Sequence, residues 1–193
     1  MMTNFFGGHD DSFEKYAFVG DYVYGRRMVG ICTNKMQYGV EINGEVVSPW
    51  FDFLLLMPNF NVCKKAGKSF LTSANGKEKI SQDYAEIEKF VKVHGLGRYY
   101  AKVKGVDGFF GTISSEGKIG IECSQEELIR FGTAFAVCGK RINGQLKYGI
   151  RAVNGEKKID YEYDEYKISG WKVCLKSENG IIVYDSVGGC RKV

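Results

Sequence analysis

The sequence predicts a mostly β fold built from tandem units that each contain a β-hairpin. The composition supports this expectation, because glycine supplies 25 of the 193 residues while proline supplies only 2. Glycine permits the tight turns that join short strands, and the many Tyr, Phe, Val and Ile residues favour the strands themselves. The strongest observation is a spacing of turn glycines that recurs along the chain, since a fixed period is typical of repeat proteins.

The recurring spacing is clearest in the unit that starts at Tyr148. A glycine follows at +7, an isoleucine at +11 and an aromatic residue at +15. The same offsets recur from Phe110 and from Ser69, although glutamine replaces the final aromatic residue of the Phe110 copy. A shorter first copy begins at Tyr38, and an incomplete fifth begins at Ile181. The turn glycines of the five copies are Gly44, Gly76, Gly117, Gly155 and Gly188.

Most of these glycines follow an asparagine. Asn-Gly between apolar runs indicates a hairpin, because both residues tolerate the positive φ that a tight turn needs. Glu116-Gly117 and Gly188-Gly189 are the variants. A second strand precedes each following unit, and it carries Val-Cys in three copies. We therefore expect one equivalent, buried position for Cys63, Cys138 and Cys174.

The expected units are approximately 38–68, 69–109, 110–147 and 148–180, with partial units at 16–37 and 181–193. Their variable lengths favour a twisted open array. Pairing between the two partial units would instead close a small propeller-like ring. Short helical turns are expected in the connections, because residues 81–94 carry apolar residues at helical spacing and Ser124-x-x-Glu127 resembles a capping box.

The charges are dispersed along the chain. With 27 basic and 23 acidic residues and a net charge of +4, no basic stripe forms, which argues against a nucleic-acid binder. No apolar run is long enough for membrane insertion, and no signal peptide is recognisable, so a cytoplasmic location is expected unless a leader has been removed. No metal or cofactor motif is found. Of the two histidines, His9 beside Asp10 and Asp11 is interpreted as part of a flexible, polar terminus, and His94 as a residue of a Gly-rich loop.

The unit resembles the WG repeat, also called the KWG repeat. The resemblance rests on Tyr148-Gly149, Asn154-Gly155 and Tyr163-Asp164, and on Tyr38-Gly39 with Phe51-Asp52 in the first copy. Aromatic residues other than tryptophan precede the glycine in this chain. The resemblance implies a β repeat architecture common in bacterial proteins and transfers no catalytic residue.

These features predict a non-catalytic binding or scaffold module whose partner is a protein or a glycan. Aromatic residues in or near the connections are the candidate anchors, although packing under loops is the alternative interpretation for each of them. These anchors are Trp50, Tyr99, Tyr100 and Trp171. The alternative function is an enzyme of unrecognised type that uses Cys123 or paired carboxylates. The repeated acids, Asp52, Asp164 and Glu165, fit better as side chains that bind the backbone of a turn in their own unit.

Overall fold

The computed structural model describes residues 16–17, 22–23, 26–32, 37–185, 187 and 189–192. The chain forms two compact parts, Met1–Tyr84 and Ala85–Val193, called here the N-terminal and the C-terminal half. No helix in the described residues is long and apolar enough to cross a membrane.

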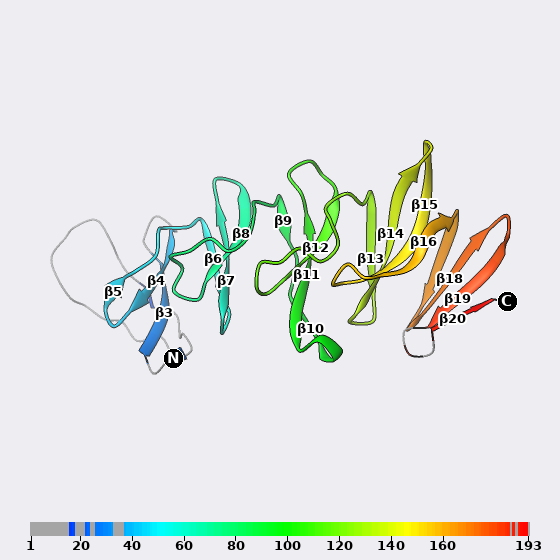
Figure 1. The fold of residues 1–193 in the computed structure, drawn as a ribbon. Coiled ribbons are helices and arrows are strands. Elements are labelled where there is room, and N and C mark those ends of the chain that lie inside the picture. Colours follow the sequence, from blue (N-terminus) through cyan, green and yellow to red (C-terminus); the bar gives the residue numbers. More distant parts are fainter. Residues whose placement is uncertain are drawn as a thin grey trace. The chain divides into compact units, whose positions relative to one another are not determined.

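The described residues of the N-terminal half form two antiparallel sheets (Figure 1). The first has the order β1-β3-β4-β5, and β2 also pairs with β3. Its strands are β1 (Tyr16–Ala17), β2 (Tyr22–Val23), β3 (Arg26–Cys32), β4 (Tyr38–Ile42) and β5 (Glu45–Val46). The second is a three-stranded meander of β6 (Phe53–Leu56), β7 (Phe60–Lys65) and β8 (Lys68–Ser73).

The C-terminal half contains three antiparallel sheets of four strands each. The first comprises β9 (Glu86–Ile87), β10 (Val91–Val93), β11 (Arg98–Lys104) and β12 (Phe110–Ser114), with the 3-10 helix η1 (His94–Leu96) before β11. The second comprises β13 (Glu127–Phe131), β14 (Phe135–Ile142), β15 (Gln145–Ala152) and β16 (Lys157–Tyr163). The third comprises β17 (Glu165–Ser169), β18 (Lys172–Ser177), β19 (Gly180–Asp185) and β20 (Gly189–Lys192).

The predicted mostly β fold of small hairpin-based sheets is confirmed. Each sheet is built from strands that follow one another along the chain, and its strands form an open path. The residues at the first and last offsets of a unit face each other across a hairpin in all four complete copies. These pairs are Tyr38↔Phe51, Ser69↔Tyr84, Phe110↔Gln125 and Tyr148↔Tyr163. The repeat spacing found in the sequence is therefore the length of one hairpin.

The expected helical turns are mostly wrong. Within residues 81–94 the structure has β9 and β10 where a helix was expected, because both strands pair with β11: Ile87 faces Val103, and Val91 faces Tyr100. Ser124-x-x-Glu127 caps no helix, since Glu127 begins β13. Pairing with a neighbouring strand satisfies these backbone groups and outweighs the helical spacing of the apolar residues. Among the described residues, the helical turn that remains is η1.

The turns also differ from the simple Asn-Gly expectation. Both turn residues have positive φ in the first copy, at Asn43 (54°) and Gly44 (88°). In the second and fourth copies, glycine alone does so. There the asparagine side chain accepts a hydrogen bond from the backbone N–H two residues later. The side-chain oxygens Oδ1 of Asn75 and Asn154 each lie 3.1 Å from the donor nitrogen. An Asx-type turn followed by a glycine therefore serves in these longer loops.

The expectation of one equivalent cysteine position is correct for Cys63 and Cys138 and wrong for Cys174. In the sheets, Cys63 faces Leu54 and Cys138 faces Leu128. The residue in that register in the last sheet is Leu175, which faces Tyr166, while Cys174 is shifted by one. A shift of one residue along a strand moves the side chain to the other face. Leu175 is accordingly fully buried and Cys174 is only half-buried.

The core of the C-terminal half lies between successive sheets. Val137 and Ile150 of the second sheet form one cluster with Val173, Leu175 and Tyr184 of the third. The first and second sheets are joined by the buried Thr112, whose Oγ1 donates to the carbonyl oxygen of Val153 at 2.6 Å. The same Oγ1 accepts from Ile121 N at 2.7 Å. Close backbone contacts explain two of the aromatic-Gly pairs, because an added Cβ would lie 2.5 Å from a backbone oxygen at Gly111 and 2.7 Å from one at Gly149.

Candidate interaction surface

The structure places the four predicted aromatic anchors in different environments. Tyr100 is 5% exposed and belongs to a core cluster with Val93 and Val153. Trp50 is half-buried, and its ring covers Gly39, where an added Cβ would lie 3.1 Å from Cζ3. Tyr99 and Trp171 are 39% and 60% exposed. Tyr99 and Tyr100 are consecutive on β11 and so point to opposite faces. The burial of Tyr100 removes it from the surface that a partner could contact.

Trp171 is the most exposed aromatic side chain among the described residues. It lies in the turn between β17 and β18, directly after Gly170, whose φ is 58°. Its ring rests on Gly132 in the turn between β13 and β14, because Cε3 and Cζ3 lie 3.0 Å from the position of an added Cβ. A side chain at position 132 would displace the indole, so glycine at this position allows the ring of Trp171 to lie against the turn.

An aromatic cluster begins at the residue before Gly132. Phe131 precedes Gly132 and stacks with Phe135, with ring centroids 5.9 Å apart. Tyr184 packs edge-on against both rings, at 6.2 Å and 5.5 Å. Gly132, under the indole of Trp171, therefore directly follows a residue of the core, while most of the Trp171 side chain faces solvent. We call Trp171 and Gly132 the indole seat.

Tyr99 is the second residue of β11 in the first sheet of the C-terminal half, where it faces Lys92 of β10. Its carbonyl oxygen accepts a hydrogen bond from Ser115 N at 2.9 Å, and the neighbouring Arg98 forms an ion pair with Glu116 at 3.0 Å. In Figure 1 the turn that carries η1 and the turn between β13 and β14 lie on the same edge of this half. The two exposed aromatic anchors therefore differ in setting, because Tyr99 belongs to a strand of the first sheet and Trp171 to a turn of the third.

The cysteine proposed for the enzyme alternative is poorly suited to nucleophilic attack. Cys123 is half-buried, and burial together with the negative charges of Asp107 and Glu122 raises the pKa of its thiol to about 11. Burial raises the thiol pKa of Cys63 to about 11 and that of Cys138 to about 12. Since the thiolate is the reactive form, we expect these three side chains to react slowly at neutral pH.

The repeated acids have structural partners. Asp52 Oδ2 accepts a hydrogen bond of 2.7 Å from Ala66 N, in the turn between β7 and β8. This contact confirms the interpretation that an acid of this kind binds a turn of its own sheet. Asp164 instead pairs with Lys147 at 2.5 Å, and Glu165 pairs with Lys176 at 3.4 Å. The carboxylates therefore neutralise lysines and hold a turn.

Metal binding receives no support from the described part of the chain, in which no three His, Cys, Asp or Glu side chains gather closely enough to hold an ion. His9, Asp10 and Asp11 lie outside the described residues. The backbone of His94 belongs to η1.

The sequence suggested Trp171 as a candidate anchor but did not predict its contact with Gly132. Gly132 has a positive φ of 57°, and the glycine after the apolar run of β13 was the available signal for a turn there. Nothing in the sequence showed that a residue 39 positions later would cover this glycine. No family model matches the chain, and no curated protein matches it.

Proposed function

We propose that this chain is a non-catalytic binding module, made of degenerate WG-like repeats, that holds a protein or a glycan partner. The observation that carries the proposal is the indole seat, where a tryptophan side chain 60% exposed to solvent is held over Gly132. The WG-like assignment is supported by the hairpin pairing of the first and last offsets in all four complete copies.

The indole of Trp171 offers both a large apolar contact area and a restricted position. Tryptophan offers the largest apolar surface of any side chain, and it is enriched among the residues that dominate binding energy. The contact with Gly132 restricts the indole before a partner arrives, which reduces the entropy lost on binding. A flat, exposed ring suits both an apolar protein side chain and the face of a sugar.

A catalytic function lacks a comparable observation. Burial raises the pKa of the Cys123 thiol to about 11, and Asp164 and Glu165 are engaged with lysines. A binding role needs neither an activated nucleophile nor a free acid, and it uses the features that the C-terminal half does present.

The test uses the fluorescence of Trp171 in the full chain. Trp50→Phe leaves Trp171 as the sole indole, and the protein is screened against a glycan array and a peptide array, with each hit then titrated by fluorescence. We expect at least one hit to change the emission of Trp171. Trp171→Ala should weaken that hit by about tenfold or more, the effect of removing a dominant contact residue.

A matched control separates the indole seat from general surface effects. Val187→Ala removes a strongly exposed apolar side chain from the turn between β19 and β20 and should leave binding unchanged. The proposal is wrong if every probe binds wild type and Trp171→Ala equally, or if neither array yields a binder.

A further inference from the structure

The strand β6 differs from the first strands of the later sheets, which are β9, β13 and β17. It lies at the edge of its sheet, in the order β6-β7-β8, and all four of its residues are uncharged: Phe53, Leu54, Leu55 and Leu56. Phe53 and Leu55 are 47% and 48% exposed. An exposed, apolar edge strand readily pairs with another strand, because one side of its backbone has hydrogen-bonding groups to offer.

The later sheets show how the same chain protects the corresponding edges. β9 is only two residues long, β13 carries Glu127 and Arg130, and β17 carries Glu165 and Lys167. Short strands and charged side chains are the usual means of preventing edge-to-edge pairing. β6 is also short, with four residues, but it carries no charged side chain. Leu55 and Ile129 hold the same register, facing Val62 and Val137. The exception points to an edge that is used for pairing.

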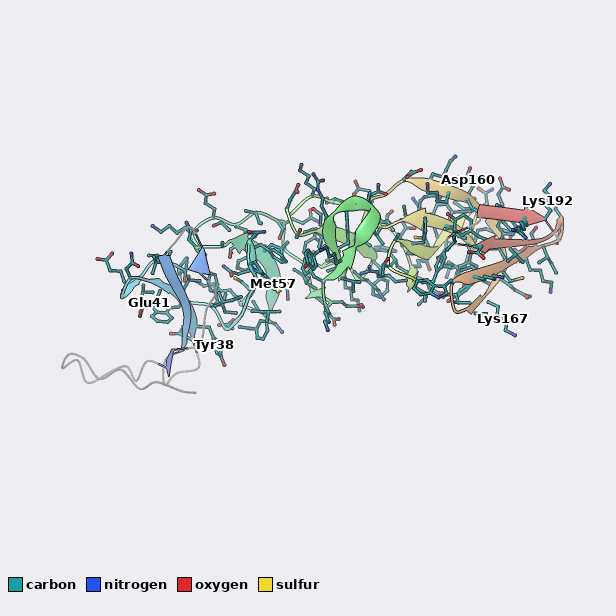
Figure 2. The ribbon with its side chains drawn as sticks, turned by 90° about the horizontal axis from the view of Figure 1, so that it is seen from below. Tyr38, Glu41, Met57, Asp160, Lys167 and Lys192 are labelled. Atoms are coloured by element: carbon teal, nitrogen blue, oxygen red, sulfur yellow. The ribbon has the colours of Figure 1, made fainter. Side chains whose placement is uncertain are left out.

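We propose that β6 pairs antiparallel with β6 of a second copy of this chain, about a two-fold axis at Leu55. This register places Leu55 opposite Leu55 of the second copy and Phe53 opposite Met57 of the second copy. Figure 2 labels Met57, which directly follows β6. Residues that face each other across an antiparallel pair share one face of the sheet, so this arrangement matches apolar side chains with apolar side chains.

Charge and symmetry both favour a second copy over an unrelated strand. The pairing brings no like charges together, since β6 and Met57 carry none. The carboxylate of Asp52, the nearest acid, already accepts a hydrogen bond from Ala66 N and so has a partner within its own sheet. A two-fold contact also consumes the β6 edge of both copies, so association stops at a dimer.

The experiment measures oligomeric state in the full chain. Sedimentation equilibrium is run from about 1 μM to about 1 mM, the range of weak and transient association. Wild type should dimerise within this range. Leu55→Lys should weaken the dimer about a hundredfold, roughly tenfold for each copy, because two like charges would then face each other at the axis.

The control is Ile129→Lys, which changes the residue of the same register in β13, 40% exposed. It should dimerise like wild type. Circular dichroism confirms that both variants keep their β structure. The proposal is overturned if wild type stays monomeric throughout, if Leu55→Lys dimerises as well as wild type, or if Ile129→Lys weakens the dimer equally.

A second measurement reports the register directly. In a background with the exposed Cys190 replaced by serine, Leu55→Cys should form an intermolecular disulfide under mild oxidation. Side chains that face each other across antiparallel strands have Cβ atoms roughly 4.5–5.5 Å apart, close to disulfide geometry. Ile129→Cys should remain uncrosslinked. Equal crosslinking of the two variants would overturn the pairing through β6.

Discussion

Replacing Thr112 by valine would test how the first two sheets of the C-terminal half are joined. The side chain is buried, and its hydroxyl serves two backbone groups that belong to distant parts of this half. It donates to Val153 O at 2.6 Å and accepts from Ile121 N at 2.7 Å. Valine has nearly the same shape and can do neither.

The expected loss of stability follows from the two backbone groups, Val153 O and Ile121 N, that lose their hydrogen-bond partner. Leaving a buried polar group without a hydrogen bond costs about 1–3 kcal/mol. Thr112→Val should therefore lower the free energy of unfolding by about 2–4 kcal/mol, allowing for partial relaxation. With a urea m-value of about 2 kcal/mol/M, the unfolding midpoint should fall by roughly 1–2 M.

Urea unfolding followed by circular dichroism and by tryptophan fluorescence measures this change. Thr112→Ser is the matched control, since it keeps the hydroxyl and removes one methyl group, a loss of about 1 kcal/mol. If valine destabilises the protein no more than serine does, the hydroxyl bridge does not hold these sheets together.

Three further predictions concern separate features. Gly155→Ala should destabilise the protein by at least about 2 kcal/mol more than Gly144→Ala, because both glycines have positive φ but only at Gly155 would a Cβ meet a backbone oxygen, at 2.3 Å; equal urea midpoints would contradict the close contact. The pKa of Cys123, raised to about 11, predicts that iodoacetamide labels it slowly at pH 7, with a rate that rises about tenfold per pH unit; mass spectrometry should find the exposed Cys190 labelled first, and the reverse order would refute the assignment. Lys79 lies 2.6 Å from Asp83 and lowers the pKa of that carboxyl. The stabilising effect of this ion pair is therefore present above the unfolded pKa of Asp83 and is lost as the pH falls through the folded pKa. Asp83→Asn should lower the free energy of unfolding by less than about 1 kcal/mol at pH 7, as for other exposed pairs, and by nothing near pH 2; a difference in thermal stability that persists at pH 2 would exclude the ion pair as its cause.

The sequence by itself determined the local features of this protein. The length of each hairpin follows from turn residues and the alternation of strand residues, so the offsets from Tyr148 to Tyr163 predicted a pairing that the sheet contains. The role of Asp52 was also accessible, because an acid bonded to a turn backbone depends on short-range geometry. The same holds for the burial of Cys63 and Cys138.

Only the tertiary structure decided the features that depend on neighbouring strands and sheets. Residues 86–87 and 91–93 form strands because β11 offers them a partner, and the register of β17 with β18 moves Cys174 out of the core position that Leu175 takes. The burial of Tyr100, the seat of Trp171 on Gly132 and the uncharged edge of β6 have the same origin. Each depends on which side chains and backbone groups the fold brings together from distant parts of the sequence, and spacing along the chain does not encode that.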